Sequence, residues 1–159
     1  MGAKYHQLGT RCAAKVKMIE VYTDGSCIGN PGPGGWAYIG PDFEFSGGSH
    51  HTTNNEMELT AAFRCLQFTF GQGEITVHTD SCYLKNGITK WVQNWKKNGW
   101  KTAAGQPVKN RELWSEIDEL NGPHVTWKWV KAHNGHPLNE KADKLAYARA
   151  LAYKKEADK

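Results

Sequence analysis

The sequence predicts an α/β domain built on a five-stranded mixed β-sheet with helices on both faces. Three short runs rich in β-branched and aromatic residues come first, separated by turn-forming residues, which is typical of an antiparallel meander. Helical patterns then alternate with two further strand-like runs, which favours parallel strands joined by helical crossovers. At 159 residues, 39% of them hydrophobic, the chain is long enough for one such domain.

The first three strands are expected at 18–23, 36–39 and 43–46. The first alternates in Met-Ile-Glu-Val-Tyr-Thr and is expected to end at Asp24. Asn, Pro and Gly gather at 30–35, which predicts a turn before the second strand. Gly40-Pro41-Asp42 predicts the turn into the third strand. We therefore expect strands one to three to be antiparallel.

A helix is expected next, because apolar residues recur on one helical face at Met57, Ala61, Cys65 and Phe68. It should begin at Asn54 or Asn55, and Gly71 and Gly73 should end it. A fourth strand at 75–79 follows a helical crossover, so it should be parallel to a neighbour.

The remaining elements alternate in type. Short helical pieces are expected after Asp80, and then a helix at 111–120 with Asn110 as its cap. A fifth strand at 125–130 and a last helix from about Leu138 complete the sheet and its cover. Residues 1–16 are expected to be a short flexible extension of a domain at 17–159.

The composition excludes several classes of protein. No apolar run approaches the roughly 20 residues that span a bilayer, and the first residues lack the apolar core of a signal peptide. The four cysteines are scattered without zinc-site spacing, so we expect reduced thiols rather than a zinc site or a disulfide framework. We therefore expect a cytoplasmic monomer with no membrane association.

Positive charge is concentrated in one segment of the chain. Residues 81–110 contain six lysines and no Asp or Glu, whereas the remaining chain has 14 basic and 16 acidic residues. One basic patch on a slightly acidic body indicates a polyanionic partner.

Aspartates end two of the predicted strands, at Asp24 and Asp80. Ligand crevices in open α/β sheets lie beyond the carboxyl ends of parallel strands, so both carboxylates should project into one crevice. Like charges held together there require a cation, which predicts a metal site. Taken singly, an Asp at a strand end is more often a turn former, and Glu58 in a first helical turn more often complements the helix dipole. Asp143 would not be chosen by chemistry alone.

Four ordered blocks resemble the bacterial type 1 ribonucleases H. They are Tyr-Thr-Asp-Gly-Ser-Cys-Ile-Gly-Asn-Pro-Gly-Pro-Gly-Gly at 22–35, Thr-Thr-Asn-Asn-Glu-Met-Glu-Leu at 52–59, Thr-Asp-Ser at 79–81, and Trp-Val-Lys-Ala-His-Asn-Gly-His-Pro-Leu-Asn-Glu at 129–140. The resemblance runs from about Met18 to Tyr153 and implies a ribonuclease H-like fold. It implies hydrolysis of the RNA strand of RNA–DNA hybrids, with 5′-phosphate and 3′-hydroxyl ends.

The resemblance also implies the residues of the site. The catalytic and metal-binding set is Asp24, Glu58, Asp80 and Asp143, with His133 as a further catalytic residue. Four carboxylates suit Mg²⁺, with two ions when substrate is bound, and Mn²⁺ is a possible substitute. A histidine of near-neutral pKa can move a proton or help the product leave.

The same resemblance assigns contacts with the hybrid. Asn30, Asn54 and Asn55 should contact the RNA strand in the minor groove, and Asn94 with Thr53 should hold a DNA phosphate. Trp91 should lie beside the DNA strand, and Lys96, Lys97 and Lys101 of a basic protrusion at about 85–109 should contact its backbone. Trp95 lies four residues after Trp91 on the same helix face, and packing is its simpler interpretation. Cys82 departs from the pattern, because many bacterial members carry Gln there.

Two other classes of function remain open at this stage. A non-catalytic hybrid-binding module would keep the fold and the basic patch, but it would be expected to lose an acid. Another nuclease of the same fold, such as an integrase or junction resolvase, would share the carboxylates. The Gly-Asn-Pro-Gly block and the Trp-Lys segment favour the ribonuclease H interpretation over this second class.

Overall fold

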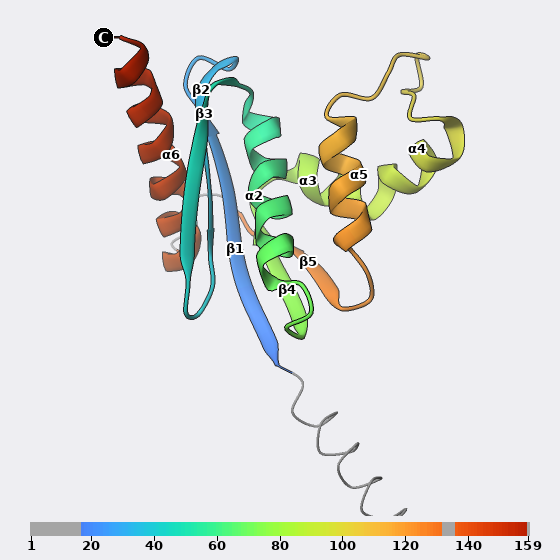
Figure 1. Ribbon diagram of the computed structural model, residues 1–159. Coiled ribbons are helices and arrows are strands. Elements are labelled where there is room, and N and C mark those ends of the chain that lie inside the picture. Colours follow the sequence, from blue (N-terminus) through green and yellow to red (C-terminus); the bar gives the residue numbers. More distant parts are fainter. Residues whose placement is uncertain (1–16, 132–135, 159) are drawn as a thin grey trace, which may run out of the picture.

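A computed structural model of the chain describes residues 17–131 and 136–158. Its strands are β1 (Met18–Cys27), β2 (Gly32–Ile39), β3 (Glu44–Thr52), β4 (Glu74–Thr79) and β5 (Val125–Trp129). They form one sheet in the order β3-β2-β1-β4-β5 (Figure 1). The β1–β2 and β2–β3 pairs are antiparallel and the β1–β4 and β4–β5 pairs are parallel, which confirms the predicted mixed sheet.

Helices cover both faces of the sheet. They are α2 (Asn54–Thr69), α3 (Cys82–Asn86), the π-helical turn η1 (Gly87–Trp91), α4 (Val92–Asn98), α5 (Arg111–Leu120) and α6 (Pro137–Ala157). The last helix packs on β1, β2 and β3, whereas α2 packs on β1 and β2 from the other side and α5 packs on α2 (Figure 1). None of the helices described here is long and apolar enough to cross a membrane.

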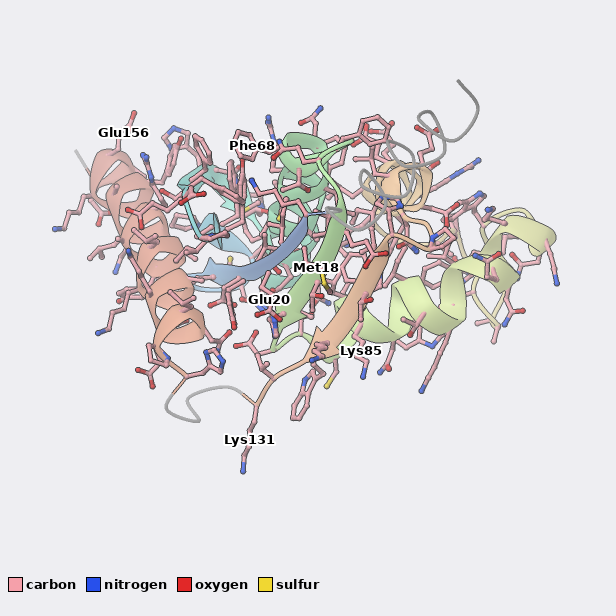
Figure 2. The ribbon with its side chains drawn as sticks, turned by 90° about the horizontal axis from the view of Figure 1, so that it is seen from below. Met18, Glu20, Phe68, Lys85, Lys131 and Glu156 are labelled. Atoms are coloured by element: carbon pink, nitrogen blue, oxygen red, sulfur yellow. The ribbon has the colours of Figure 1, made fainter. Side chains whose placement is uncertain are left out.

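The larger core lies between the sheet and α2. Ile19, Val21 and Val77 from the strands are buried there against Leu59 of α2 and Trp114 of α5. The opposite face of β1 carries the alternate residues, Glu20 and Tyr22. Figure 2 shows Glu20 on the other side of the sheet from Phe68 of α2. Strand alternation thus separates the two faces, as the sequence pattern predicts.

The antiparallel strands are longer than the sequence analysis predicts. β1 continues through Asp24 to Cys27, β2 begins at Gly32 instead of residue 36, and β3 reaches Thr52 instead of residue 46. Gly34 and Gly35, expected in the turn at 30–35, are instead paired within the sheet, with Ser49 and Gly48. A Cβ on Gly35 would overlap the carbonyl oxygen of Ala146, so the absence of a side chain lets α6 lie directly on the sheet.

Two local expectations differ in detail from the structure. Phe68 is expected on the buried stripe of α2 but is 41% exposed, and its ring contacts the half-buried Phe43 and the exposed Phe45. Asn110 occupies the cap position of α5, but its amide donates to the Tyr83 hydroxyl (3.3 Å) rather than capping the helix. The expected extension at 1–16 lies outside the described residues.

Candidate active site

The site begins at the close contact between β1 and the first turn of α2. Asp24 of β1 is 2% exposed and Glu58 of α2 is 3% exposed. Gly25 follows Asp24, and a Cβ there would overlap the backbone of Met57 and Glu58. Thr53 caps the helix, accepting a hydrogen bond from the Glu56 N–H (3.1 Å). Gly25 lets β1 and α2 approach closely, and the Thr53 cap fixes the start of α2. The carboxylates of Asp24 and Glu58 therefore lie close together.

Asp80 joins them from the neighbouring parallel strand. It follows β4 directly, and one side-chain oxygen each of Asp24, Glu58 and Asp80 lie within 4.8 Å of one another. Two contacts hold the backbone here: Trp129 Nε1 donates to the Asp80 carbonyl (3.2 Å), and the Ser81 hydroxyl accepts from the Leu84 N–H (3.1 Å). The predicted meeting of two strand-end aspartates is therefore present, with Glu58 beside them.

Asp143 is the fourth acid of the predicted set. It lies on α6 and lines the same hollow as Asp24, Glu58 and Asp80, together with Cys82. We call this feature the acid hollow. Asp143 also interacts with the side chain of Asp24. The structure thus brings together all four acids from β1, α2, the end of β4 and α6.

The carboxylates are held in an unfavourable electrostatic setting. Burial raises the pKa of Asp24, and the negative charges of Glu58 and Asp80 raise it further. Burial is also the main cause of the raised pKa of Glu58, with Asp80 and Asp143 adding to it. A cation placed among these oxygens would reverse this effect by stabilising the charged forms.

The donor set fits a hard divalent cation. Asp24 Oδ2 and Glu58 Oε2 are buried and have no hydrogen-bond partner within the described parts of the chain. A buried carboxylate oxygen without a partner is costly unless it binds a cation. Oxygen donors with room for water are what Mg²⁺ and Mn²⁺ prefer. Asp24, Glu58, Asp80 and Asp143 can therefore hold such ions.

His133 lies outside the described residues. His136, which follows that segment, has its ring against Tyr22, with centroids 4.9 Å apart. Its Nε2 lies 3.4 Å from the Tyr22 hydroxyl. This contact attaches His136 to β1.

A second hollow lies beside the acids, between the start of α2 and the basic protrusion. We call it the protrusion groove. It is lined by Asn30, Thr53, Asn54, Asn55, Tyr83, Trp91, Trp95, Thr102, Gln106, Pro107, Val108, Lys109 and Asn110. Five predicted substrate-binding residues are therefore gathered in one place. Asn30 Oδ1 also accepts a hydrogen bond from the Asn54 N–H (2.9 Å), which ties the loop after β1 to the start of α2.

The other predicted contacts are spread over the exposed surface of the protrusion. Asn94, Lys97 and Lys101 are exposed on α4 and just after it and are not part of the described lining of the groove. Lys96 differs from them, because its Nζ forms an ion pair with Asp118 of α5 (2.9 Å). The fold thus uses Lys96 to fasten α4 to α5.

The two tryptophans of α4 and the turn before it differ in their surroundings. Trp91 is 37% exposed and lies at the groove. Trp95 packs edge-on against the fully buried Trp114, with centroids 5.6 Å apart. Packing is thus the main role of Trp95, and Trp91 presents its ring to the groove.

Sequence analysis missed several residues around the two hollows. Lys109 lines the groove, and its place in the lysine-rich segment at 81–110 is the sequence feature that could have identified it. Tyr83 and Thr102 carry no such signal, because their position depends on how the protrusion folds back. Trp129 holds the backbone of Asp80, and only the register of β5 reveals this contact.

Known proteins share this sequence and architecture. The family model described as RNase H matches residues 16–151. The chain belongs to the RNase H family. The ribonuclease H of Chelativorans sp. (strain BNC1) is 52% identical, over 88% of this chain and 90% of the relative. That of Mesorhizobium japonicum is 53% identical, over 87% of this chain and 81% of the relative.

Solved structures give the same result for this RNase H family member. LC9-RNase H1, described as a type 1 RNase H with the type 2 active-site motif, superimposes with a TM-score of 0.76 at 31% identity. That match covers 87% of this chain and 74% of LC9-RNase H1. The PFV RNase H domain superimposes with a TM-score of 0.73 at 25% identity, over 88% of this chain and 98% of that domain. The sequence resemblance to bacterial type 1 ribonucleases H is thereby confirmed.

Proposed function

We propose that this RNase H family member hydrolyses the RNA strand of RNA–DNA hybrids at the acid hollow, using two divalent ions and leaving 5′-phosphate and 3′-hydroxyl ends. Its family membership makes it a hydrolase that acts on such hybrids. The observation that carries the proposal is the convergence of four carboxylates, two of them buried with unpartnered oxygens. A binding module would have no use for so costly an arrangement.

The four acids would hold Mg²⁺, or Mn²⁺ in its place. Bound divalent ions supply an activated water and neutralise charge at the scissile phosphate. Asp24 and Glu58 each interact with the other three acids. These two buried carboxylates, together with Asp80 and Asp143, would hold the ions. His133 would move a proton or assist departure of the product.

The protrusion groove supplies the recognition of the hybrid. Selecting RNA opposite DNA requires a reader of the 2′-hydroxyl, for which short amide side chains are suited. Asn54 and Asn55 begin α2 and line both hollows, and Asn30, in the loop after β1, lies beside them in the groove. Thr53 with Asn94 would hold a DNA phosphate, and Trp91 would lie along the DNA strand. Lys97 and Lys101 would contact the backbone without reading sequence.

The decisive experiment is cleavage of a labelled RNA–DNA hybrid with Mg²⁺, alongside RNA–RNA and DNA–DNA duplexes. Wild type should cut only the RNA strand of the hybrid, and mass spectrometry should find 5′-phosphate ends. Asp80→Asn should abolish cutting, whereas Asp42→Asn, in the exposed β2–β3 turn, should not. Tight hybrid binding without cutting under Mg²⁺ or Mn²⁺ would instead support the binding-module alternative. Cutting of DNA–DNA duplexes would support another nuclease of the same fold.

We further propose that the protein acts as a monomer in the cytoplasm. All four acids and the groove come from a single chain, so a second copy is not needed to complete the site. Sedimentation with and without hybrid tests this, and one protein per short hybrid is the expected stoichiometry.

A further inference from the structure

Three aromatic rings lie together on the α6 face of the sheet, next to the acids in sequence. Tyr22 precedes Asp24 by two residues on β1, and His78 precedes Asp80 by two residues on β4. Tyr22 and His78 are partners in the parallel register, and their rings are stacked with centroids 4.3 Å apart and planes at 9°. His136 adds a third ring, tilted by 40° against Tyr22. We call these three residues the ring stack.

The ring stack is held by contacts on its other sides. Tyr22 is 6% exposed and His78 is 7% exposed. The Tyr22 hydroxyl reaches His136 Nε2 (3.4 Å), and His78 Nε2 lies 3.4 Å from Glu20 Oε1. Glu20 lies at the sheet surface in Figure 2. The stack is therefore a fixed unit attached to both aspartate-bearing strands.

The stack also meets the helix that carries the fourth acid. His136 comes directly before α6, and Ala142, the neighbour of Asp143, belongs to the same buried cluster as Tyr22. Tyr22 thus contacts His136 at the start of the α6 region and shares a buried cluster with the neighbour of Asp143.

Other contacts of α6 reach β3: Lys141 Nζ pairs with Glu44 (2.7 Å), and Arg149 Nε donates to the Ser46 hydroxyl (2.9 Å). The buried side chains of α6 beyond its first turn are Ala142, Ala146 and Ala150, and they face glycine-containing strands. Small side chains on both sides bring the helix backbone close to the sheet. The ring stack adds a contact between the start of α6 and the aspartate-bearing strands β1 and β4.

We propose that Tyr22, His78 and His136 are positioning residues that fix Asp143 relative to Asp24 and Asp80. The inference rests on the proposed function, in which these acids hold the divalent ions. The stack itself touches neither substrate nor ion. It acts because a displacement of about 1 Å in a catalytic group can reduce a rate by about 100-fold.

The test compares two buried tyrosines on neighbouring strands. Tyr22→Leu removes the central ring of the stack, whereas Tyr38→Leu removes a ring that is 5% exposed on β2 and packs with Phe43 and Phe45. The melting temperature should fall by a similar amount in both variants. Tyr22→Leu should also lose at least 10-fold in kcat, with KM for the hybrid within 2-fold of wild type. Tyr38→Leu should keep kcat within 2-fold.

Metal binding to the free protein gives a readout independent of cleavage. In an Mg²⁺ titration followed by NMR, Tyr22→Leu should weaken binding by at least 3-fold, and Tyr38→Leu should not. If wild type fails to cut hybrids, the proposed function fails, but these affinities still test the ring stack. Equal kcat and Mg²⁺ affinity in the two variants would overturn the inference.

A second pair of variants keeps the test valid if Tyr22→Leu does not fold. His136→Ala removes a half-buried ring and should lower kcat and Mg²⁺ affinity in the same way. His136→Phe restores a ring without its nitrogens and should recover at least half of the lost kcat. A positioning role would be contradicted if His136→Ala kept wild-type kcat and Mg²⁺ affinity, or if His136→Phe recovered none of the lost kcat.

Discussion

The acid hollow and the basic protrusion differ in how the fold holds their charges. Asp24 and Glu58 are 2% and 3% exposed and come from elements packed in the centre of the molecule. Lys97 and Lys101 are exposed on a projecting segment (Figure 1). Carboxylates that must share a metal ion need fixed geometry, and burial provides it at an electrostatic cost. Lysines that meet a phosphate backbone work by net charge and tolerate mobility.

Removing a buried acid should have the largest effect. Asp24→Asn should reduce hybrid cleavage by at least 1,000-fold, because it deletes a buried carboxylate of the proposed metal-holding set. The same change should raise metal-free stability by about 1 kcal/mol, since it removes a carboxyl whose charged form is disfavoured by burial and, further, by the neighbouring acids. Cleavage assays and thermal melts in EDTA measure the two effects. A loss of activity with a lower melting temperature would mean that Asp24 is mainly structural.

The pH dependence of the free energy of unfolding should reveal the cost of holding the Asp24 and Glu58 carboxyls buried beside other acids. The folded-state pKa values of Asp24 and Glu58 are raised, so the folded protein binds more protons than the unfolded chain above about pH 4. Stability without metal should therefore fall as pH rises from about 4 toward 8. Saturating Mg²⁺ should make stability nearly independent of pH over this range, and Glu58→Gln should make the loss of stability smaller. Melting curves at several pH values, with EDTA or Mg²⁺, give the result; no difference between the two series would contradict it.

The protrusion allows a comparison between two adjacent lysines. Lys97→Ala should weaken hybrid binding a few-fold and lower the salt slope of log K by about one. Lys96→Ala should lower the slope less and cost about 0.5 kcal/mol of stability, because Lys96 is paired with Asp118. Each lysine change is made in the non-cutting Asp80→Asn variant, and fluorescence anisotropy of a labelled hybrid then gives the salt slope for each. Equal slopes for both variants would show that Lys96 leaves its ion pair to bind phosphate.

Cys82 should give the smallest effect. It is exposed at the rim of the acid hollow, where many bacterial members carry Gln. Cys82→Gln would supply an amide for the RNA strand and should lower KM by about 2-fold with kcat unchanged, an effect of roughly 0.4 kcal/mol. Cys82→Ala is the matched control and should behave as wild type. A change in kcat in either variant would show that residue 82 affects the acids themselves.

Much of the fold was predictable from local patterns. Alternation located β1, β4 and β5, and the spacing of Met57, Ala61 and Cys65 located α2 to within a residue at its start. The extents of β2 and β3 were wrong, because Gly34, Gly35, Gly47 and Gly48 look like turn residues locally. These glycines let neighbouring segments approach the sheet closely. A local sequence pattern does not show contacts between distant segments.

The sequence by itself determined the fold class, the family, the pairing of Asp24 with Asp80 at parallel strand ends and the position of the positive charge. These follow from periodicity, ordered blocks and composition, which are properties of the chain. The family resemblance implied Asp143, and the tertiary structure places it among the other acids. Only the tertiary structure decided that Lys96 pairs with Asp118 and that Tyr22, His78 and His136 stack together. Each of these depends on how α6 or α5 packs against distant segments, and packing between distant segments is fixed by shape and burial rather than by local spacing.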